Sequence, residues 1–243
     1  LICVGDHPAS QVYIRNKITA CDQVGIKSWV YRFEGQRSER AVLNKIVELN
    51  SDDEVHGILV QLPLPRSFNI ERVIEAIDPA KDVDGFHPVN IGKLFSGKAL
   101  FSPCTPWGIM RLIDHYKIQV EGKHAVVVGR SAIVGKPMAI MLLERHSTVT
   151  ICTSKTTNLS DHVFKADILV VAAGKQNLIR GNMVKKGAVV IDVGINELPD
   201  GSLTGDVDFS GILEVASWIS PVPGGVGPMT IAGLLTNTVK AFR

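Results

Sequence analysis

Short apolar runs alternate with helical patterns along the first third of the chain. The predicted strands are residues 1–5, 28–33 and 56–65, and the predicted helices are residues 10–25, 37–50 and 69–79. The helix at 69–79 has the clearest apolar stripe, and Asn69 stands where an N-cap is expected. Strands separated by helices indicate βαβ units and a parallel sheet.

A long segment with little periodicity follows at residues 81–106, "KDVDGFHPVNIGKLFSGKALFSPCTP". It is rich in turn-forming residues and is too long for a simple connector between two elements. We therefore interpret it as a functional or boundary segment.

The alternation resumes after this segment. The predicted strands are residues 124–129, 147–152, 166–174, 187–194 and 217–220, and the main predicted helices are residues 133–145 and 227–242. The pattern predicts an α/β protein with two lobes in tandem.

Composition narrows the class of protein. The formal net charge of +2 over 243 residues does not favour a general nucleic-acid or membrane surface. The four scattered cysteines form no C-x-x-C pair, so neither a disulfide framework nor a zinc site is indicated, and we expect a reducing, cytoplasmic compartment. No apolar run approaches the roughly 18–20 residues of a membrane span. Because the chain opens inside a predicted strand, we expect residues to precede Leu1.

The junction "HAVVVGRSAIVGKPMA" places a glycine turn between a strand and a helix, as a dinucleotide-binding loop requires. Gly129 allows the tight turn, and Gly135 allows a pyrophosphate to approach the N–H groups at the helix N-terminus. Pro137 suits the first helical turn. The alternative is a glycine-rich turn that binds no ligand.

The end of the next strand indicates which cofactor is bound. NAD-binding folds usually carry an acidic residue there for the ribose 2′-hydroxyl, whereas this chain has "TSKTTN". Ser154, Lys155 and Arg130 are suited to a 2′-phosphate, which favours NADP. Alternatively, Lys155 and Arg130 are exposed loop charges.

Three polar residues in the first lobe are candidates for a catalytic role. Tyr13 and Lys17 share one face of a predicted helix, beside an apolar stripe. Gln61 follows a buried strand at its carboxyl end, the edge where open α/β sheets bind ligands. Alternatively, the stem of Lys17 only lies along apolar surface with its amine in water, and Gln61 only forms a turn.

Two acids lie in the loop "KDVDG". Asp82 and Asp84 are either turn formers or ligands for a substrate amine or amidine. A metal site is disfavoured, because only His87 is close in sequence and no third carboxylate accompanies the pair. Cys104 has no evident catalytic partner, and we expect a packed thiol.

The run "SPVPGGVGPMT" forms a rigid turn with little side-chain bulk before the last helix. Such a turn lets backbone approach a flat ligand closely. The alternative is a stiff linker between the lobes.

Six stretches, in order along the chain, carry a resemblance to a known family. They are "PASQVYIRNK", "VQLPLP", "KDVDGFHP", "PCTPWG", "VVGRSAIVGKPM" and "PVPGGVGPMT". Together they closely resemble the bifunctional methylenetetrahydrofolate dehydrogenase/cyclohydrolase family, essentially from end to end. The resemblance implies NADP-dependent oxidation of 5,10-methylenetetrahydrofolate to the 5,10-methenyl form. It also implies hydrolysis of that product to 10-formyltetrahydrofolate, in one-carbon metabolism that supports purine biosynthesis.

The resemblance also implies roles for individual residues. Lys17 matches the catalytic lysine, Tyr13 its neighbour, Gln61 the glutamine that tunes it, and Asp84 the aspartate that holds the pterin. The further substrate-binding positions are Leu62, Pro63, Pro221, Gly224 and Gly225. The cofactor-binding positions are Gly129, Arg130, Ser131, Ile133, Val134, Gly135, Ser154, Lys155, Thr156, Gly174 and Ile195. No metal is needed.

The same resemblance implies the domain organisation. Residues 1–105, with the last helix at 229–243, are expected to form the folate-binding domain, and residues 106–228 the Rossmann-type NADP-binding domain. A homodimer formed through the cofactor domain is expected. One rival hypothesis is a monofunctional dehydrogenase, perhaps with NAD, and the retained Lys17 and Gln61 and the acid-free "TSKTT" argue against it. The other is a non-catalytic nucleotide-sensing or scaffold module, and the retained Lys17 and Asp84 argue against it.

Overall fold

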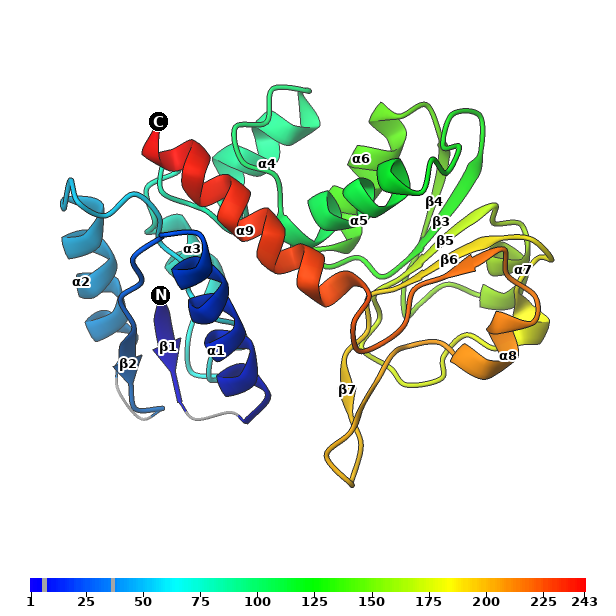
Figure 1. Ribbon diagram of the computed structural model, residues 1–243, viewed down its shortest axis with the longest axis horizontal. Helices are drawn as coiled ribbons and strands as arrows, with labels where there is room; N and C mark the ends of the chain where they lie inside the picture. Colours follow the sequence, from blue (N-terminus) through cyan, green and yellow to red (C-terminus); the bar gives the residue numbers. More distant parts are fainter. Residues whose placement is uncertain (6–7, 36–37) are drawn as a thin grey trace. The chain divides into compact units, whose positions relative to one another are not determined.

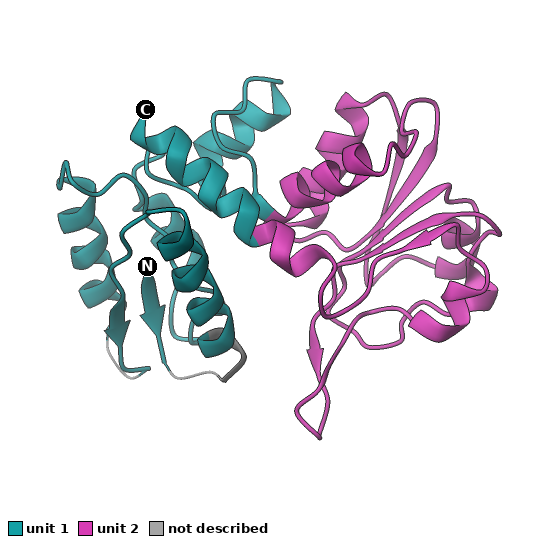
Figure 2. Cartoon of the chain, in the orientation of Figure 1, with its two compact units in different colours: residues 1–104, 231–243 teal, residues 105–230 magenta. Residues whose placement is uncertain are grey.

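The structure is a computed structural model that describes residues 1–5, 8–35 and 38–243. Its backbone contacts divide the chain into two compact units (Figure 2). Unit 1 comprises Leu1–Cys104 and Ile231–Arg243, and unit 2 comprises Thr105–Thr230. The last helix, α9 (Val226–Phe242), begins in unit 2 and ends in unit 1. Within the described residues, no helix is long and apolar enough to cross a membrane.

Unit 1 is built on short parallel strands. β1 (Ile2–Val4) pairs in parallel with β2 (Tyr31–Phe33). The predicted strand at residues 56–65 pairs only through isolated parallel bridges, from Val60 to Ile2 and from Ile58 to Asp82. Pro63 and Pro65 end this pairing because proline has no N–H to donate to a ladder.

Unit 1 also contains several helices (Figure 1). They are α1 (Pro8–Gln23), α2 (Glu39–Asn50), α3 (Ile70–Glu75) and α4 (Pro88–Phe95), together with most of α9. The predicted N-cap is confirmed, because the Asn69 side chain accepts a hydrogen bond from Arg72 N at 3.0 Å. Arg37, the predicted start of the second helix, lies outside the described residues.

The segment at 81–106 contains more regular structure than its sequence pattern indicates. α4 begins with Pro88, and His87 caps it by accepting a hydrogen bond from Val89 N at 3.1 Å. α5 (Cys104–His115) begins within the same segment. α4 is only two turns long and buries the polar Asn90 along with Leu94, so no apolar period revealed it.

Unit 2 contains a five-stranded parallel sheet in the order β4-β3-β5-β6-β9. The strands are β3 (His124–Val128), β4 (Thr148–Cys152), β5 (Ile168–Val171), β6 (Val189–Asp192) and β9 (Trp218–Ile219). The helices are α5, α6 (Gly135–Glu144), α7 (Leu159–Phe164) and α8 (Phe209–Leu213), with a short 3-10 turn η1 (Gly181–Met183). A two-stranded antiparallel pair joins β7 (Asn196–Glu197) to β8 (Leu203–Thr204).

Alternate residues of the central strands enter two separate cores. Ala125 and Val127 of β3 pack with Ile109 and Met138, from α5 and α6. Val126 and Val128 pack in the second core, which includes residues of α7 and α8. Helices therefore cover both faces of a parallel sheet, and the predicted α/β class is confirmed.

Asn237 of α9 fixes the loop that carries Asp84. Its side chain is 2% exposed and donates to Val83 O at 2.9 Å and to Ser102 O at 3.0 Å, all within unit 1. We expect Asn237→Leu to lower the free energy of unfolding by about 2–3 kcal/mol, because two buried carbonyl groups lose their donor. Urea unfolding of the purified chain checks this. Val239→Leu, at a half-exposed position of the same helix, is the control and should change stability by less than about 0.5 kcal/mol. Equal effects of the two variants would contradict the role of Asn237.

Candidate functional site

A buried lysine and an amide meet in unit 1. Lys17, on α1, is only 6% exposed, and its Nζ donates a hydrogen bond to Gln61 Oε1 at 3.1 Å. Gln61 Nε2 donates to Leu62 O at 2.8 Å, which fixes the orientation of the amide. The Tyr13 ring lies one helical turn away, with its centroid 5.8 Å from Nζ. The structure thus brings Lys17, Tyr13 and Gln61 together and holds the amine out of bulk water.

The two acids of the "KDVDG" loop have different environments. The Asp82 carboxylate is buried and accepts hydrogen bonds from Phe86 N at 3.1 Å, His87 N at 2.8 Å and Asn90 Nδ2 at 2.8 Å. Among the described residues, no hydrogen-bond donor contacts the Asp84 carboxylate. Asp82 is therefore the acid that shapes the turn, and Asp84 keeps its acceptor oxygens for other groups.

Burial raises the pKa of the Asp84 carboxyl from 3.8 to about 6. The Lys17 ammonium opposes this rise, and the negative charge of Asp82 adds to it. Lys17 and Asp84 are therefore coupled electrostatically.

Sequence reasoning did not find Asn237, whose side chain donates to the carbonyl groups of Val83, the neighbour of Asp84, and of Ser102. An asparagine within a long apolar helix was the available signal. Cys104 lies nearby, and burial raises the pKa of its thiol well above the usual value, which agrees with the expected packed thiol.

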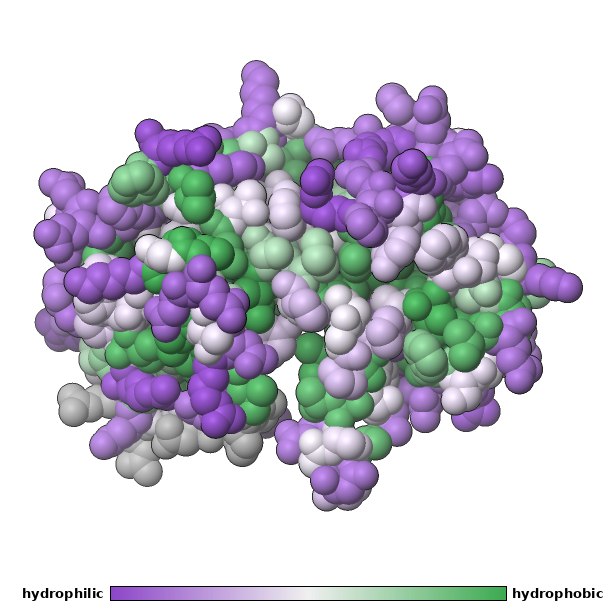
Figure 3. Space-filling view, viewed as in Figure 1, coloured by the Kyte–Doolittle hydropathy of each residue, from purple (hydrophilic) through white to green (hydrophobic). Residues whose placement is uncertain are grey.

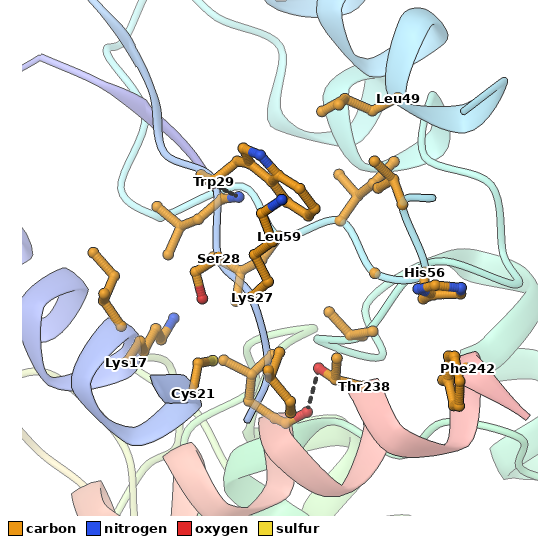
Figure 4. A pocket seen from close by; sticks show the side chains of 18 of the residues that line it. Lys17, Cys21, Lys27, Ser28, Trp29, Leu49, His56, Leu59, Thr238 and Phe242 are labelled. Atoms are coloured by element: carbon orange, nitrogen blue, oxygen red, sulfur yellow. Dashed lines mark hydrogen bonds between the residues drawn. The ribbon is translucent and has the colours of Figure 1, made fainter. Parts of the chain in front are cut away.

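A hollow of about 400 Å³ in unit 1 shares Lys17 with this site but not its other residues. Its lining includes Lys17 and Cys21 of α1, Trp29, and Thr238 and Phe242 of α9 (Figure 4), but not Gln61 or Asp84. Hydrophobic residues also show among polar ones on the surface of unit 1 (Figure 3). The hollow lies where β1 and β2 begin, whereas ligands of parallel sheets bind where strands end, so we do not assign the substrate to it.

In unit 2, the loop after β3 has the shape of a dinucleotide-binding turn. Gly129 has φ +136°, which only glycine adopts easily, and a side chain there would overlap Ala172 O. A side chain at Gly135 would overlap Gly129 O, so this glycine closes the turn on itself. Ser131 Oγ accepts from Val134 N at 3.1 Å and from Gly135 N at 3.3 Å, which orders the turn at the N-terminus of α6.

Exposed polar groups follow the carboxyl ends of the neighbouring parallel strands β3 and β4. Val128 and Cys152 are register partners, and parallel neighbours lie about 5 Å apart. Arg130 and Ser154 each stand two residues beyond these partners, and both are exposed. Thr156 Oγ1 accepts from Thr153 N at 2.8 Å and closes the turn that presents Ser154 and Lys155. Residues 129–136 and 153–158 include no acid, so the hydroxyl, ammonium and guanidinium groups that they carry suit a 2′-phosphate.

The remaining predicted cofactor positions lie at the same edge of the unit 2 sheet. Gly174 follows β5, and Ile195 follows β6 with 48% of its surface exposed. Pro221, Gly224 and Gly225 follow β9 and precede α9, which begins at Val226, one residue earlier than predicted. The residues of unit 2 therefore fit a dinucleotide along the carboxyl ends of β3, β4, β5 and β6.

Comparison with known proteins identifies the family of this chain. Residues 1–84 match the profile of the tetrahydrofolate dehydrogenase/cyclohydrolase catalytic domain, and residues 103–243 match that of the family's NAD(P)-binding domain. The bifunctional protein FolD of Nitrosomonas europaea is 57% identical over 241 residues, covering 99% of this chain and 82% of the relative.

Solved structures show the same fold. The bifunctional FolD enzyme of Campylobacter jejuni aligns with a TM-score of 0.95 at 53% identity, over 99% of this chain and 86% of that one. The Trypanosoma brucei methylenetetrahydrofolate dehydrogenase-cyclohydrolase, solved with NADP cofactor and inhibitor, aligns with a TM-score of 0.95 at 37% identity, over 99% and 84%. The chain belongs to the tetrahydrofolate dehydrogenase/cyclohydrolase family.

Proposed function

We propose that Lys17, Gln61, Tyr13 and Asp84 carry out both steps of this family's reaction on one folate. In the first step, 5,10-methylenetetrahydrofolate loses a hydride and becomes the 5,10-methenyl cation. Bound NADP⁺ accepts that hydride. In the second step, water adds to the methenyl carbon, one carbon–nitrogen bond breaks, a proton is released and 10-formyltetrahydrofolate forms.

The hydrogen bond between Lys17 Nζ and Gln61 Oε1 supports this assignment most strongly. Lys17 in its neutral form tolerates the developing folate cation better than an ammonium does. In the hydrolytic step, Lys17 takes a proton from the attacking water. Gln61 accepts one N–H of Lys17 without adding charge, and it thereby orients the amine.

Asp84 is assigned to the pterin ring. A carboxylate that no described donor satisfies can accept paired hydrogen bonds from the ring N–H groups. This contact fixes the reacting carbon relative to Lys17. Tyr13 packs beside the amine and, with Leu62 and Pro63, borders the substrate.

Unit 2 is assigned to NADP, and unit 1 to the folate. Residues 129–135 hold the pyrophosphate, Arg130 with Ser154 and Lys155 hold the 2′-phosphate, and Thr156, Gly174 and Ile195 border the remainder. Pro221, Gly224 and Gly225 are assigned to the nicotinamide and folate side. We also propose a cytoplasmic homodimer formed through unit 2. All four cysteines are unpaired, and edge strand β4 carries Ile151 with 43% of its surface exposed.

Replacing the amine tests the mechanism directly. We expect Lys17→Met to reduce the cyclohydrolase rate by about 10²–10⁴-fold, since the general base is lost, while the circular dichroism spectrum stays unchanged. Loss of methenyltetrahydrofolate absorbance measures that rate. Lys27→Met, an exposed lysine of unit 1 that lies over Trp29, is the matched control and should retain full activity. Hydrolysis at the wild-type rate by Lys17→Met would remove Lys17 from the mechanism.

The cofactor assignment has its own test. We expect Arg130→Ala to raise KM for NADP⁺ by about 10–100-fold and to leave KM for the folate within twofold, because a charged hydrogen bond to phosphate contributes about 1.5–3 kcal/mol. Steady-state formation of NADPH measures both constants. Arg145→Ala, at the opposite end of α6, should leave both constants unchanged. A parallel rise in the two constants for Arg130→Ala would argue against a phosphate contact.

The raised pKa of Asp84 makes the stability of the ligand-free protein depend on pH. Since the folded-state pKa of about 6 lies above the ordinary 3.8, ionising Asp84 destabilises the fold, increasingly as pH rises from about 4 to about 6. We expect Asp84→Asn to gain about 1–2 kcal/mol over the wild type between pH 4.5 and pH 7.5. Urea unfolding at the two pH values measures the gain.

Asp82→Asn is the control for this experiment. The two Asp82 oxygens together accept three hydrogen bonds, and the substitution replaces one of them with an N–H₂ group that opposes a buried donor, so it should destabilise the protein at both pH values. A constant difference between Asp84→Asn and the wild type at both pH values would show that Asp84 is not the titrating group.

A further inference from the structure

The buried aspartate Asp206 in unit 2 binds two loops that border the proposed nicotinamide half of the cofactor site. Asp206 has no exposed surface. Its Oδ2 accepts from Ala173 N at 2.6 Å and from Gly174 N at 2.8 Å, and its Oδ1 accepts from Lys175 N at 2.8 Å. Three consecutive backbone N–H groups thus converge on one carboxylate, as they do around a bound anion.

The same carboxylate also holds the loop after the next strand. Asn196 Nδ2 donates to Asp206 Oδ1 at 2.9 Å. Gly194 packs so closely that any side chain there would overlap the Asp206 carboxylate. Asp206 therefore ties the loop after β5 to the loop after β6, and these strands are neighbours in the parallel sheet.

Asp206 is itself held in place from the end of β6. The Asp192 carboxylate accepts from Asp206 N at 2.9 Å, Val207 N at 3.1 Å and Gly194 N at 3.0 Å. Hydrogen bonds therefore fix both the backbone and the carboxylate oxygens of Asp206. Burying two carboxylates costs desolvation energy, which their hydrogen bonds must offset. We therefore interpret the cluster as a device that holds the two loops in one conformation.

We propose that Asp206 is a positioning residue that sets loops 173–175 and 194–196 for the nicotinamide half of NADP. In a parallel sheet of this order, the first loop, after β3, receives the pyrophosphate and the end of β4 receives the adenosine ribose. The ends of β5 and β6 then face the other half of the dinucleotide. The inference rests on the proposed placement of the cofactor at residues 129–135.

Two ligands separate the halves of the site in the test. Adenosine 2′,5′-bisphosphate carries the 2′-phosphate but lacks nicotinamide, whereas NADP⁺ carries both. In Asp206→Asn, an amide N–H₂ replaces one acceptor oxygen and opposes the donors that it faced. We expect Kd for NADP⁺ to rise at least tenfold and Kd for adenosine 2′,5′-bisphosphate to stay within twofold. The cyclohydrolase rate, which does not use the dinucleotide, should also stay within twofold.

Asp208→Asn is the matched control. It removes the same charge two residues away, where Asp208 caps α8 by accepting from Gly211 N at 3.2 Å and does not contact either loop. Both dissociation constants should match the wild type in this variant.

Calorimetry on the full chain supplies the dissociation constants, and circular dichroism monitors folding. If Asp206→Asn weakened the binding of both ligands equally, or of neither, the proposal would be overturned.

If that variant failed to fold, Asn196→Ala would decide, because it removes one of the four donors to the Asp206 carboxylate and leaves three. Asn196→Ala should raise Kd for NADP⁺ by about two- to fivefold and leave Kd for adenosine 2′,5′-bisphosphate unchanged. An unchanged Kd for NADP⁺ would overturn the proposal. Failure of the wild type to bind adenosine 2′,5′-bisphosphate would count against the proposed 2′-phosphate site and not against Asp206.

Discussion

Loops between strands and helices leave backbone N–H groups without strand partners, and buried aspartates satisfy several of these groups in this protein. Asp82 accepts from two such groups in unit 1. In unit 2, Asp206 accepts from three and Asp192 from three more. An unpaired buried N–H costs about 1–3 kcal/mol, so these carboxylates decide whether the loops at the functional edge keep one conformation.

The arrangement leaves other polar groups available for ligands. Because Asp82 supplies the turn, the carboxylate oxygens of Asp84 accept no hydrogen bond from the described residues and interact electrostatically with Lys17. Because Ser131 and Thr156 close the turns after β3 and β4, the side chains of Arg130, Ser154 and Lys155 face outward. A rigid backbone with exposed side chains suits a site that must position its ligands for reaction.

The two units use the same sequence feature in different ways. The tripeptide Asp-Val-Asp occurs at residues 82–84 and again at residues 206–208. In both, the first aspartate is buried and anchors backbone N–H groups. The second aspartate differs, because Asp84 stays free of described donors while Asp208 caps a helix. The recurrence of this tripeptide is the signal in the amino-acid sequence that points to Asp206.

The sequence by itself determined the α/β class, most strands and helices, the N-cap at Asn69 and the family, because apolar periodicity and local motifs are properties of neighbouring residues. It suggested Lys17 and Gln61 as a pair only through the resemblance, since 44 residues separate them. Only the tertiary structure decided that Asp82 and Asp84 differ, that Asn237 closes the loop from 154 residues away, and that Asp206 joins two loops. Burial and hydrogen bonding between distant segments arise after folding, so no local pattern in the chain encodes them.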